Sequence, residues 1–181
     1  MKKTSFLFVL MLIAVVGFTQ KKTTTSAIIS FDATTAIDAL PKAENKTAIA
    51  AIDPSKGTVQ FEATIKNFDF SNPRIQDHFN QKGWMSSDEF PKATFNGAIT
   101  NLSSVNFKKD GTYTANVAGD LTIHGQTQKI NTDATIVVTG ANIKATSSFS
   151  IKLADYGVDG AQVISGKVSR EPKITVSAEF N

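Results

Sequence analysis

The stretch Lys66–Gly97, KNFDFSNPRIQDHFNQKGWMSSDEFPKATFNG, interrupts a chain that otherwise alternates between apolar and polar residues. It is rich in phenylalanine and contains Trp84, the only tryptophan of the sequence. After Pro73, the four-residue spacing of Ile75 and Phe79 places both side chains on one face of a short helix. Such an aromatic-rich segment between two strands must bury its rings against a sheet. We interpret the stretch as a lid or plug, and simple hydrophobic capping of a barrel end is an equally weighted alternative.

On both sides of this stretch, apolar residues recur with the period of two that is typical of β-strands. In the clearest case, Val59, Phe61, Ala63 and Ile65 alternate with polar residues. A single helical turn is expected at residues 36–40. Further strands, separated by turn sequences rich in Gly, Asp and Asn, are expected at residues 27–31, 46–52, 93–99, 113–123, 128–138, 143–153 and 173–180.

Eight strands joined by hairpin-type turns, with little helix, predict an all-β protein. We expect an extended eight-stranded antiparallel β-barrel with a short helix and an aromatic loop between the third and fourth strands. A two-layer sandwich is the alternative. Small residues occupy many inward-facing strand positions: Ala63, Ala93, Gly97, Ala115, Gly119, Ala134, Ala145, Ser147 and Ala178. Because they do not fill a barrel of this width, they predict an internal space occupied by an apolar ligand or by the aromatic plug.

The N-terminal segment is expected to be removed from the mature protein. Two lysines precede the apolar run Phe6–Val16, which is the pattern of a secretory signal peptide over residues 1–19. The run is shorter than the roughly 20 residues of a spanning helix, so no stable membrane insertion is expected. Residues 20–26 are then a flexible leader, and residues 27–181 form one barrel domain. The protein is therefore predicted to be periplasmic or secreted.

Composition excludes several classes of function. The sequence has no cysteine, so it has no disulfide, thiol catalysis or lipid-anchored cysteine. Without Lys2 and Lys3, 17 basic residues (19 − 2) face 16 acidic ones, and the mature chain is almost neutral. No basic stripe interleaved with aromatic residues is present, and we expect no nucleic-acid partner.

The sequence contains no nucleotide-binding, hydrolase or metalloprotease motif, and we predict neither an enzyme, a cofactor nor a metal site. Asp120, Thr122 and His124 are expected on one strand face. The backbones of Asp120 and His124 would lie about 13 Å apart, too far for one metal ion. His78 beside Asp77 is interpreted as an ordinary pair on a helix surface.

A family resemblance is carried by several segments. The stretch Val117–Lys129, VAGDLTIHGQTQK, resembles the v-x-G-x-L-T-i-x-G-x-t-k core of the YceI-like, lipocalin-like polyisoprenoid-binding family. Asp77–Asn80 with Trp84–Gly97 resembles that family's helix and its s-x-x-F-P-x-a-x-F segment. Ile151–Val158 resembles its i-x-R-x-d-f-G-i segment, with Leu153 in place of the arginine, whereas the first strand lacks the H-S-x-v-x-F pattern.

This resemblance covers essentially the whole mature chain. It implies an extended antiparallel barrel with a long internal tunnel that takes an isoprenoid tail, in exported bacterial proteins. Two functions remain open: a non-catalytic carrier of an isoprenoid, quinone or other long-chain amphiphile, and a structural or stress-related envelope protein whose barrel is plugged by its own aromatic residues. Both a monomer and a homodimer are open. The residues expected to contact the ligand are Phe61, Ala63, Phe68, Phe79, Trp84, Met85, Phe90, Phe95, Ala115, Val117, Gly119, Leu121, Ala145, Ser147 and Phe149.

Overall fold

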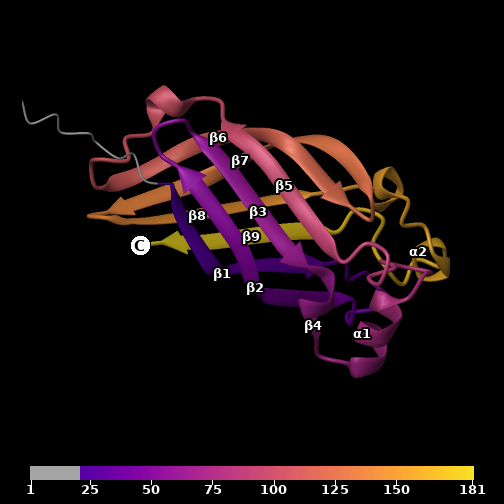
Figure 1. Cartoon of the computed structure of the whole chain (residues 1–181). Coiled ribbons are helices and arrows are strands. Elements are labelled where there is room, and N and C mark those ends of the chain that lie inside the picture. The colour runs from indigo at the N-terminus through magenta and orange to yellow at the C-terminus, as the bar shows by residue number, and fades with distance from the viewer. Residues whose placement is uncertain (1–20) are drawn as a thin grey trace, which may run out of the picture.

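The computed structural model describes residues 21–181, which fold into a closed antiparallel β-barrel (Figure 1). The predicted signal peptide at residues 1–19 lies outside the described residues. The barrel strands are β1 (Lys22–Asp32), β2 (Lys42–Asp53), β3 (Thr58–Thr64), β5 (Lys92–Ile99), β6 (Gly111–Ile123), β7 (Gln126–Thr139), β8 (Asn142–Ser150) and β9 (Lys173–Phe180). Each pairs with the next, and β1 pairs with both β2 and β9, which closes the ring. The predicted eight-stranded barrel is thus confirmed, with one additional short strand, β4 (Asp69–Phe70), on the edge of β2.

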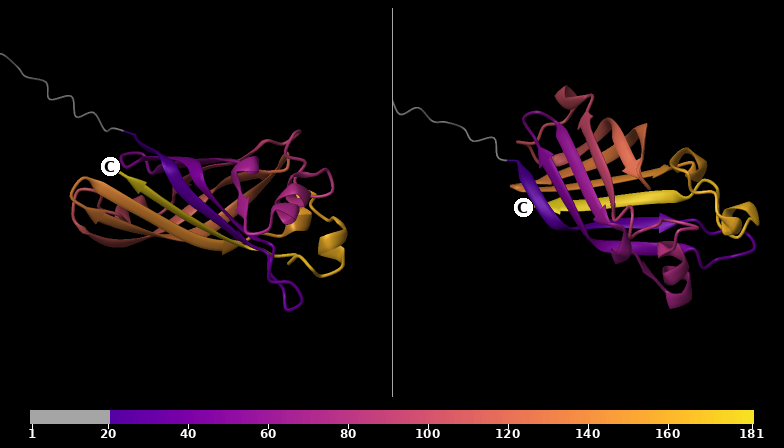
Figure 2. Two further views of the ribbon diagram at one scale, coloured as in Figure 1. Left: turned by 90° about the horizontal axis from the view of Figure 1, so that it is seen from below. Right: turned by 45° about the vertical axis from the view of Figure 1, so that its right-hand side comes forward.

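The two ends of the barrel differ in their connections. Three long segments, residues 33–41, 65–91 and 151–172, gather at one end with helices α1 (Pro73–Asn80) and α2 (Ala161–Ile164), as Figures 1 and 2 show. We call this the helix-bearing end. The opposite end, the hairpin end, has two short turns, residues 54–57 and 140–141, and the connection at residues 100–110. It also carries the first described residue and the C-terminus (Figure 1). Three short 3-10 turns complete the structure: η1 (Ile65–Asn67), η2 (Leu102–Ser104) and η3 (Leu153–Tyr156).

Two local predictions differ from the structure. Residues 22–26, assigned to a flexible leader, instead form the first half of β1, where Thr23 and Thr24 pair with β2. Threonine is favourable in strands, and without these residues this edge of β2 would be unpaired, since β3 covers only the other edge. The helical turn expected at residues 36–40 is absent. The Thr35 hydroxyl accepts from the backbone N–H of Asp38, and the Asp38 carboxylate accepts from that of Leu40, so side chains compete with helical hydrogen bonds.

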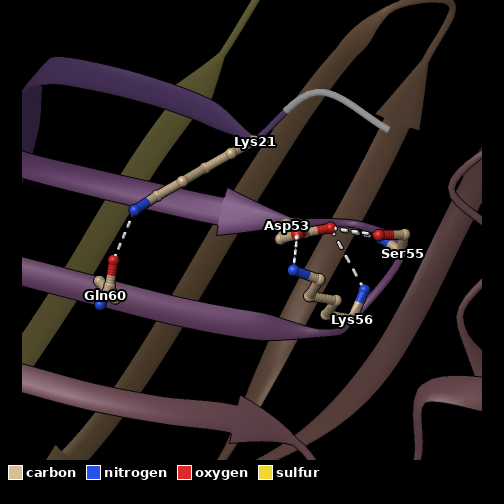
Figure 3. Close-up of polar contacts among 5 residues, drawn as sticks. All are labelled: Lys21, Asp53, Ser55, Lys56 and Gln60. Atoms are coloured by element: carbon tan, nitrogen blue, oxygen red, sulfur yellow. Dashed lines mark hydrogen bonds and ion pairs between the residues drawn. The ribbon is translucent and has the colours of Figure 1, made fainter. Parts of the chain in front are cut away.

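The turn between β2 and β3 at the hairpin end is held by Asp53 (Figure 3). Its Oδ1 accepts from the Ser55 hydroxyl at 2.6 Å and from the backbone N–H groups of Ser55 at 2.9 Å and Lys56 at 3.2 Å. These hydrogen bonds, the Ser55 hydroxyl first, lower the pKa of Asp53. Nearby, Lys21 Nζ donates to Gln60 Oε1 at 2.6 Å (Figure 3), which links the start of the described chain to β3.

The barrel interior near the hairpin end is filled by side chains. Ala115 is fully buried there, and Ile136 of β7 and Phe180 of β9 are almost entirely shielded from solvent. The remaining buried residues of this half come from the same ends of neighbouring strands, among them Ile52, Val59, Ile99, Val138, Ile143 and Ala178. This half of the barrel is an ordinary packed core.

Gly97 of β5 and Gly119 of β6 are paired partners, and the ring of Phe95 covers both. A Cβ atom at Gly119 would lie 2.5 Å from the Asn96 carbonyl oxygen and 2.7 Å from Phe95 Cζ. The two glycines therefore allow close approach of the strands and make room for an aromatic ring. The Phe95 ring therefore fills the space that the small size of Gly97 and Gly119 would otherwise leave inside the barrel.

Replacing Gly119 by alanine is expected to destabilise the barrel by about 1–3 kcal/mol, because the added methyl group overlaps the backbone of β5. Urea denaturation of the two proteins measures the difference. Gly83→Ala is the matched control, since no atom lies within 4 Å of a Cβ placed there. An unchanged unfolding free energy for Gly119→Ala would contradict the close approach of the strands.

Candidate ligand-binding cavity

A cavity of about 140 Å³ lies inside the barrel, toward the helix-bearing end. Its wall is formed by all the barrel strands except β2, together with the segments that follow β3 and β8. Among the lining residues, Thr94 and Thr132 carry the only hydroxyl groups, and none is charged. The lining residues are Ile29, Phe31, Phe61, Ala63, Ile65, Phe68, Phe79, Trp84, Met85, Ala93, Thr94, Phe95, Val117, Leu121, Ile123, Ile130, Thr132, Phe149, Ile151, Leu153, Ile174 and Val176.

A group of five aromatic residues borders the cavity at the helix-bearing end. The Phe79 ring lies at its centre, with its centroid 4.9 Å from that of Phe70, 5.4 Å from that of Trp84, and 6.0 Å from those of Phe31 and Phe68. These tilted and edge-to-face arrangements are the favourable ones for aromatic pairs. We call this group the aromatic cap. The structure has features of both the lid interpretation and the capping interpretation. The segment at residues 65–91 buries its rings at the barrel end, and it also forms one wall of the cavity.

Local sequence explains how α1 places Phe79. The Asn72 side chain accepts from the backbone N–H of Arg74 at 3.0 Å, and Pro73 occupies the first helical position, both common at helix starts. The helix then ends at Asn80, where the backbone N–H of Gln81 donates to the His78 carbonyl. Ile75 is half-buried and Phe79 buried, so the predicted apolar face of this helix is confirmed.

Backbone hydrogen bonds hold the loop after α1 against the barrel. The N–H of Met85 donates to the Phe79 carbonyl at 3.0 Å, and the N–H of Ser87 donates to that of Asn80 at 3.1 Å. Trp84 N–H donates to Gln81 in the same way. The side chains of Trp84 and Met85 are consequently buried and face the cavity.

The structure brings most of the predicted contact residues together around the cavity. Those that line it are Phe61, Ala63, Phe68, Phe79, Trp84, Met85, Phe95, Val117, Leu121 and Phe149. The other five, Phe90, Ala115, Gly119, Ala145 and Ser147, do not. Sequence reasoning missed several lining residues from β1, β7 and β9, such as Ile29, Ile130 and Ile174. Alternation with polar neighbours marks Ile130 and Ile174 as inward-facing, whereas Ile29 follows another isoleucine.

Phe90 is excluded from the cavity by its contact with the β6–β7 turn. Its ring packs edge-on against His124, with centroids 4.7 Å apart and an angle of 67° between the planes. His124 itself lies in that turn with φ 50°, and its Nδ1 is 3.1 Å from the Tyr156 carbonyl oxygen. The expectation that His124 shares a strand face with Asp120 is therefore wrong, because the turn redirects the side chain toward η3.

The remaining four residues do not line the cavity for other reasons. Ala115 is 0% exposed and is surrounded by the packed core. Ser147 donates its hydroxyl to the Asp133 carbonyl at 2.7 Å and lies 3.1 Å from the Thr132 hydroxyl, so neighbouring strands occupy its hydrogen-bonding capacity. Ala145 and Gly119 face inward at filled levels of the barrel.

Polar chemistry is sparse over residues 21–181. His78 and Asp77 are both exposed on α1, as expected for a helix-surface pair. No three His, Cys, Asp or Glu side chains of the described residues are grouped so that they would hold a metal ion. None of the helices in this part of the chain combines the length and the apolar character needed to cross a membrane.

The chain belongs to the YceI-like domain family, whose model matches residues 14–180. Its fold is similar to that of a polyisoprenoid binding domain from Saccharophagus degradans implicated in plant cell wall breakdown, with a TM-score of 0.74, 13% identity, and coverage of 89% of this chain and 97% of that one. Burkholderia cenocepacia BcnA is similar with a TM-score of 0.70, 22% identity, and coverage of 86% and 96%. The Campylobacter jejuni YCEI protein is similar with a TM-score of 0.56, 19% identity, and coverage of 75% of this chain and 80% of that one. No curated protein matches the sequence.

The cavity and the packed core predict opposite responses to added side-chain volume. Ala115→Phe is expected to cost about 1–3 kcal/mol or more, because the ring overpacks a filled region. Ala63→Leu adds methyl groups where the cavity has room and is expected to cost less than about 1 kcal/mol or to be slightly stabilising. Denaturant unfolding of both variants makes the comparison. Equal destabilisation of the two variants would contradict the division of the barrel interior into a packed core around Ala115 and a cavity beside Ala63.

Proposed function

We propose that this protein is an exported bacterial lipid-binding protein that holds the tail of an isoprenoid, quinone or other long-chain amphiphile inside its barrel, without catalysis. The observation that carries the proposal is the uncharged, almost wholly apolar cavity beneath the aromatic cap. Membership of the YceI-like domain family and the similar fold of a polyisoprenoid binding domain support it. The wall offers no carboxylate, imidazole, thiol or amine for acid–base or nucleophilic chemistry.

The affinity for such a ligand would come from burial of hydrocarbon, at about 0.8 kcal/mol per methylene before ordering costs. A cavity of about 150 Å³ in another protein accommodates benzene, so the 140 Å³ here corresponds to roughly one isoprene unit. A longer tail therefore requires bordering side chains to move. The aromatic cap is the part of the wall best suited to do so, because Phe68, Phe79 and Trp84 are carried by connecting segments and not by barrel strands.

The second candidate is a structural or stress-related envelope protein plugged by its own aromatic residues. The same cap favours it, since Phe79 packs against four other rings at the helix-bearing end of the barrel. The two candidates differ in whether lipid is bound to the native protein.

Native mass spectrometry of the protein purified from its own cell envelope tests the carrier function. The parent protein is expected to retain a lipid, and Ala63→Leu should remove most of it while preserving the fold, because the added methyl groups occupy the ligand volume. Ala36→Leu is the matched control, since the same change at an exposed position should leave lipid binding unaltered. A parent protein without lipid would contradict the carrier function and favour the plugged barrel.

We further propose export to the periplasm or the medium, on the basis of the apolar run that follows Lys2 and Lys3. Intact-mass measurement on envelope material is expected to show a mature chain that begins near Gln20. A soluble cytoplasmic protein that retains Met1 would refute this expectation.

A further inference from the structure

The indole N–H of Trp84 is a buried donor without a partner. The side chain is 6% exposed, and its Nε1 atom has no acceptor among the described residues. Buried polar groups are nearly always hydrogen-bonded, and an unpaired one destabilises the fold. Trp84 lines the cavity wall, so a molecule in the cavity can approach this residue.

We propose that the ligand carries a neutral oxygen acceptor, such as an alcohol, an ether or a quinone carbonyl, which accepts the hydrogen bond of Trp84 Nε1 beneath the aromatic cap. This inference rests on the proposed lipid-binding function and specifies the polar end of its ligand. The acceptor would form a hydrogen bond with the indole N–H of Trp84. The other residues that line the cavity are apolar except for Thr94 and Thr132, which each carry a hydroxyl group. The Thr132 hydroxyl is already 3.1 Å from that of Ser147.

A neutral acceptor fits the wall better than a phosphate. No lysine, arginine or histidine lines the cavity, and burying an uncompensated anion is far more costly than burying a hydroxyl or carbonyl group. The polar pocket on the outer side of the same loop does not supply the missing cation. Its Lys66 is engaged by Asp88 at 2.6 Å, and Lys82 is accompanied there by Asp77 and Glu89.

Among residues 21–181, no internal acceptor takes this role. The Asn80 Oδ1 atom is also buried without a donor, but Asn80 lines the outer polar pocket and not the cavity. Its amide nitrogen donates to the Gln76 carbonyl at 2.8 Å, which ties the side chain to α1. Trp84, by contrast, faces the interior together with Met85 and Phe79.

Three ligands with the same tail separate the alternatives: farnesol, its hydrocarbon counterpart without the hydroxyl, and farnesyl monophosphate. Each is measured by displacement of the fluorescent probe N-phenyl-1-naphthylamine from the full mature chain. Farnesol is expected to bind the parent protein most tightly. Trp84→Phe should weaken farnesol binding about five- to tenfold and change hydrocarbon binding by less than about twofold, because it removes a single hydrogen bond. The control Phe95→Leu, which alters a lining ring without a donor, should weaken both ligands alike.

A second measurement needs no variant. Because the chain has one tryptophan, its ¹⁵N–¹H spectrum contains one indole resonance, and farnesol but not the hydrocarbon should move that resonance downfield. Tightest binding of the monophosphate, or farnesol binding that is insensitive to Trp84→Phe with an unmoved indole resonance, would overturn the inference and leave lipid binding standing. Failure of the parent protein to bind any of the three would overturn the proposed function itself. If Trp84→Phe does not fold, the indole resonance of the parent protein decides.

Discussion

The burial of the Phe79 ring is the interaction on which the helix-bearing end depends. Its four aromatic neighbours come from β1, from the segment around β4 and from the loop after α1, so one side chain joins three parts of the chain. Together with the pairing of β4 and β2, this cluster holds the long segment between β3 and β5 against the barrel. The same cluster determines where the cavity ends. Closure of the barrel and formation of the candidate site are therefore consequences of the same packing.

The barrel interior has two regions: a packed core near the hairpin end and a cavity toward the helix-bearing end. Ala115 and Leu121 lie on the same face of β6, yet the first is enclosed by packed core and the second borders the cavity. An unfilled volume of 140 Å³ costs roughly 3 kcal/mol at about 24 cal/mol per Å³. The filled half near the hairpin end offsets that cost through ordinary hydrophobic burial. The Gly97–Gly119 pair lies between the two halves, where it lets Phe95 lean across the interior.

Much of this arrangement follows from the sequence, and the exceptions have identifiable physical causes. Alternation reveals which face of a strand is inward, and it correctly indicated the barrel. Ten of the 22 residues that line the cavity were among the predicted contact residues. Alternation does not reveal the level of a residue along the barrel axis, so Ala115 and Ala145 were assigned to the cavity although they lie in the filled half. Phe90 was misplaced for another reason. Its ring packs against His124 in the β6–β7 turn instead of against the cavity. Because His124 has a positive φ, which a strand pattern does not predict, this contact could not be foreseen from the alternation of residues.

The polarity of the cavity wall limits what the barrel can select. An apolar wall of this kind distinguishes hydrocarbon chains weakly, because one methylene more or less changes the free energy of binding by only about 1–3 kcal/mol. Polar groups discriminate more strongly, since a buried charge without a partner is heavily penalised. A wall without a cation would therefore select against anionic head groups. On the proposed function, the N–H group of Trp84 would favour neutral oxygenated lipids over plain hydrocarbons, and the absence of a cation among the lining residues would exclude anionic lipids.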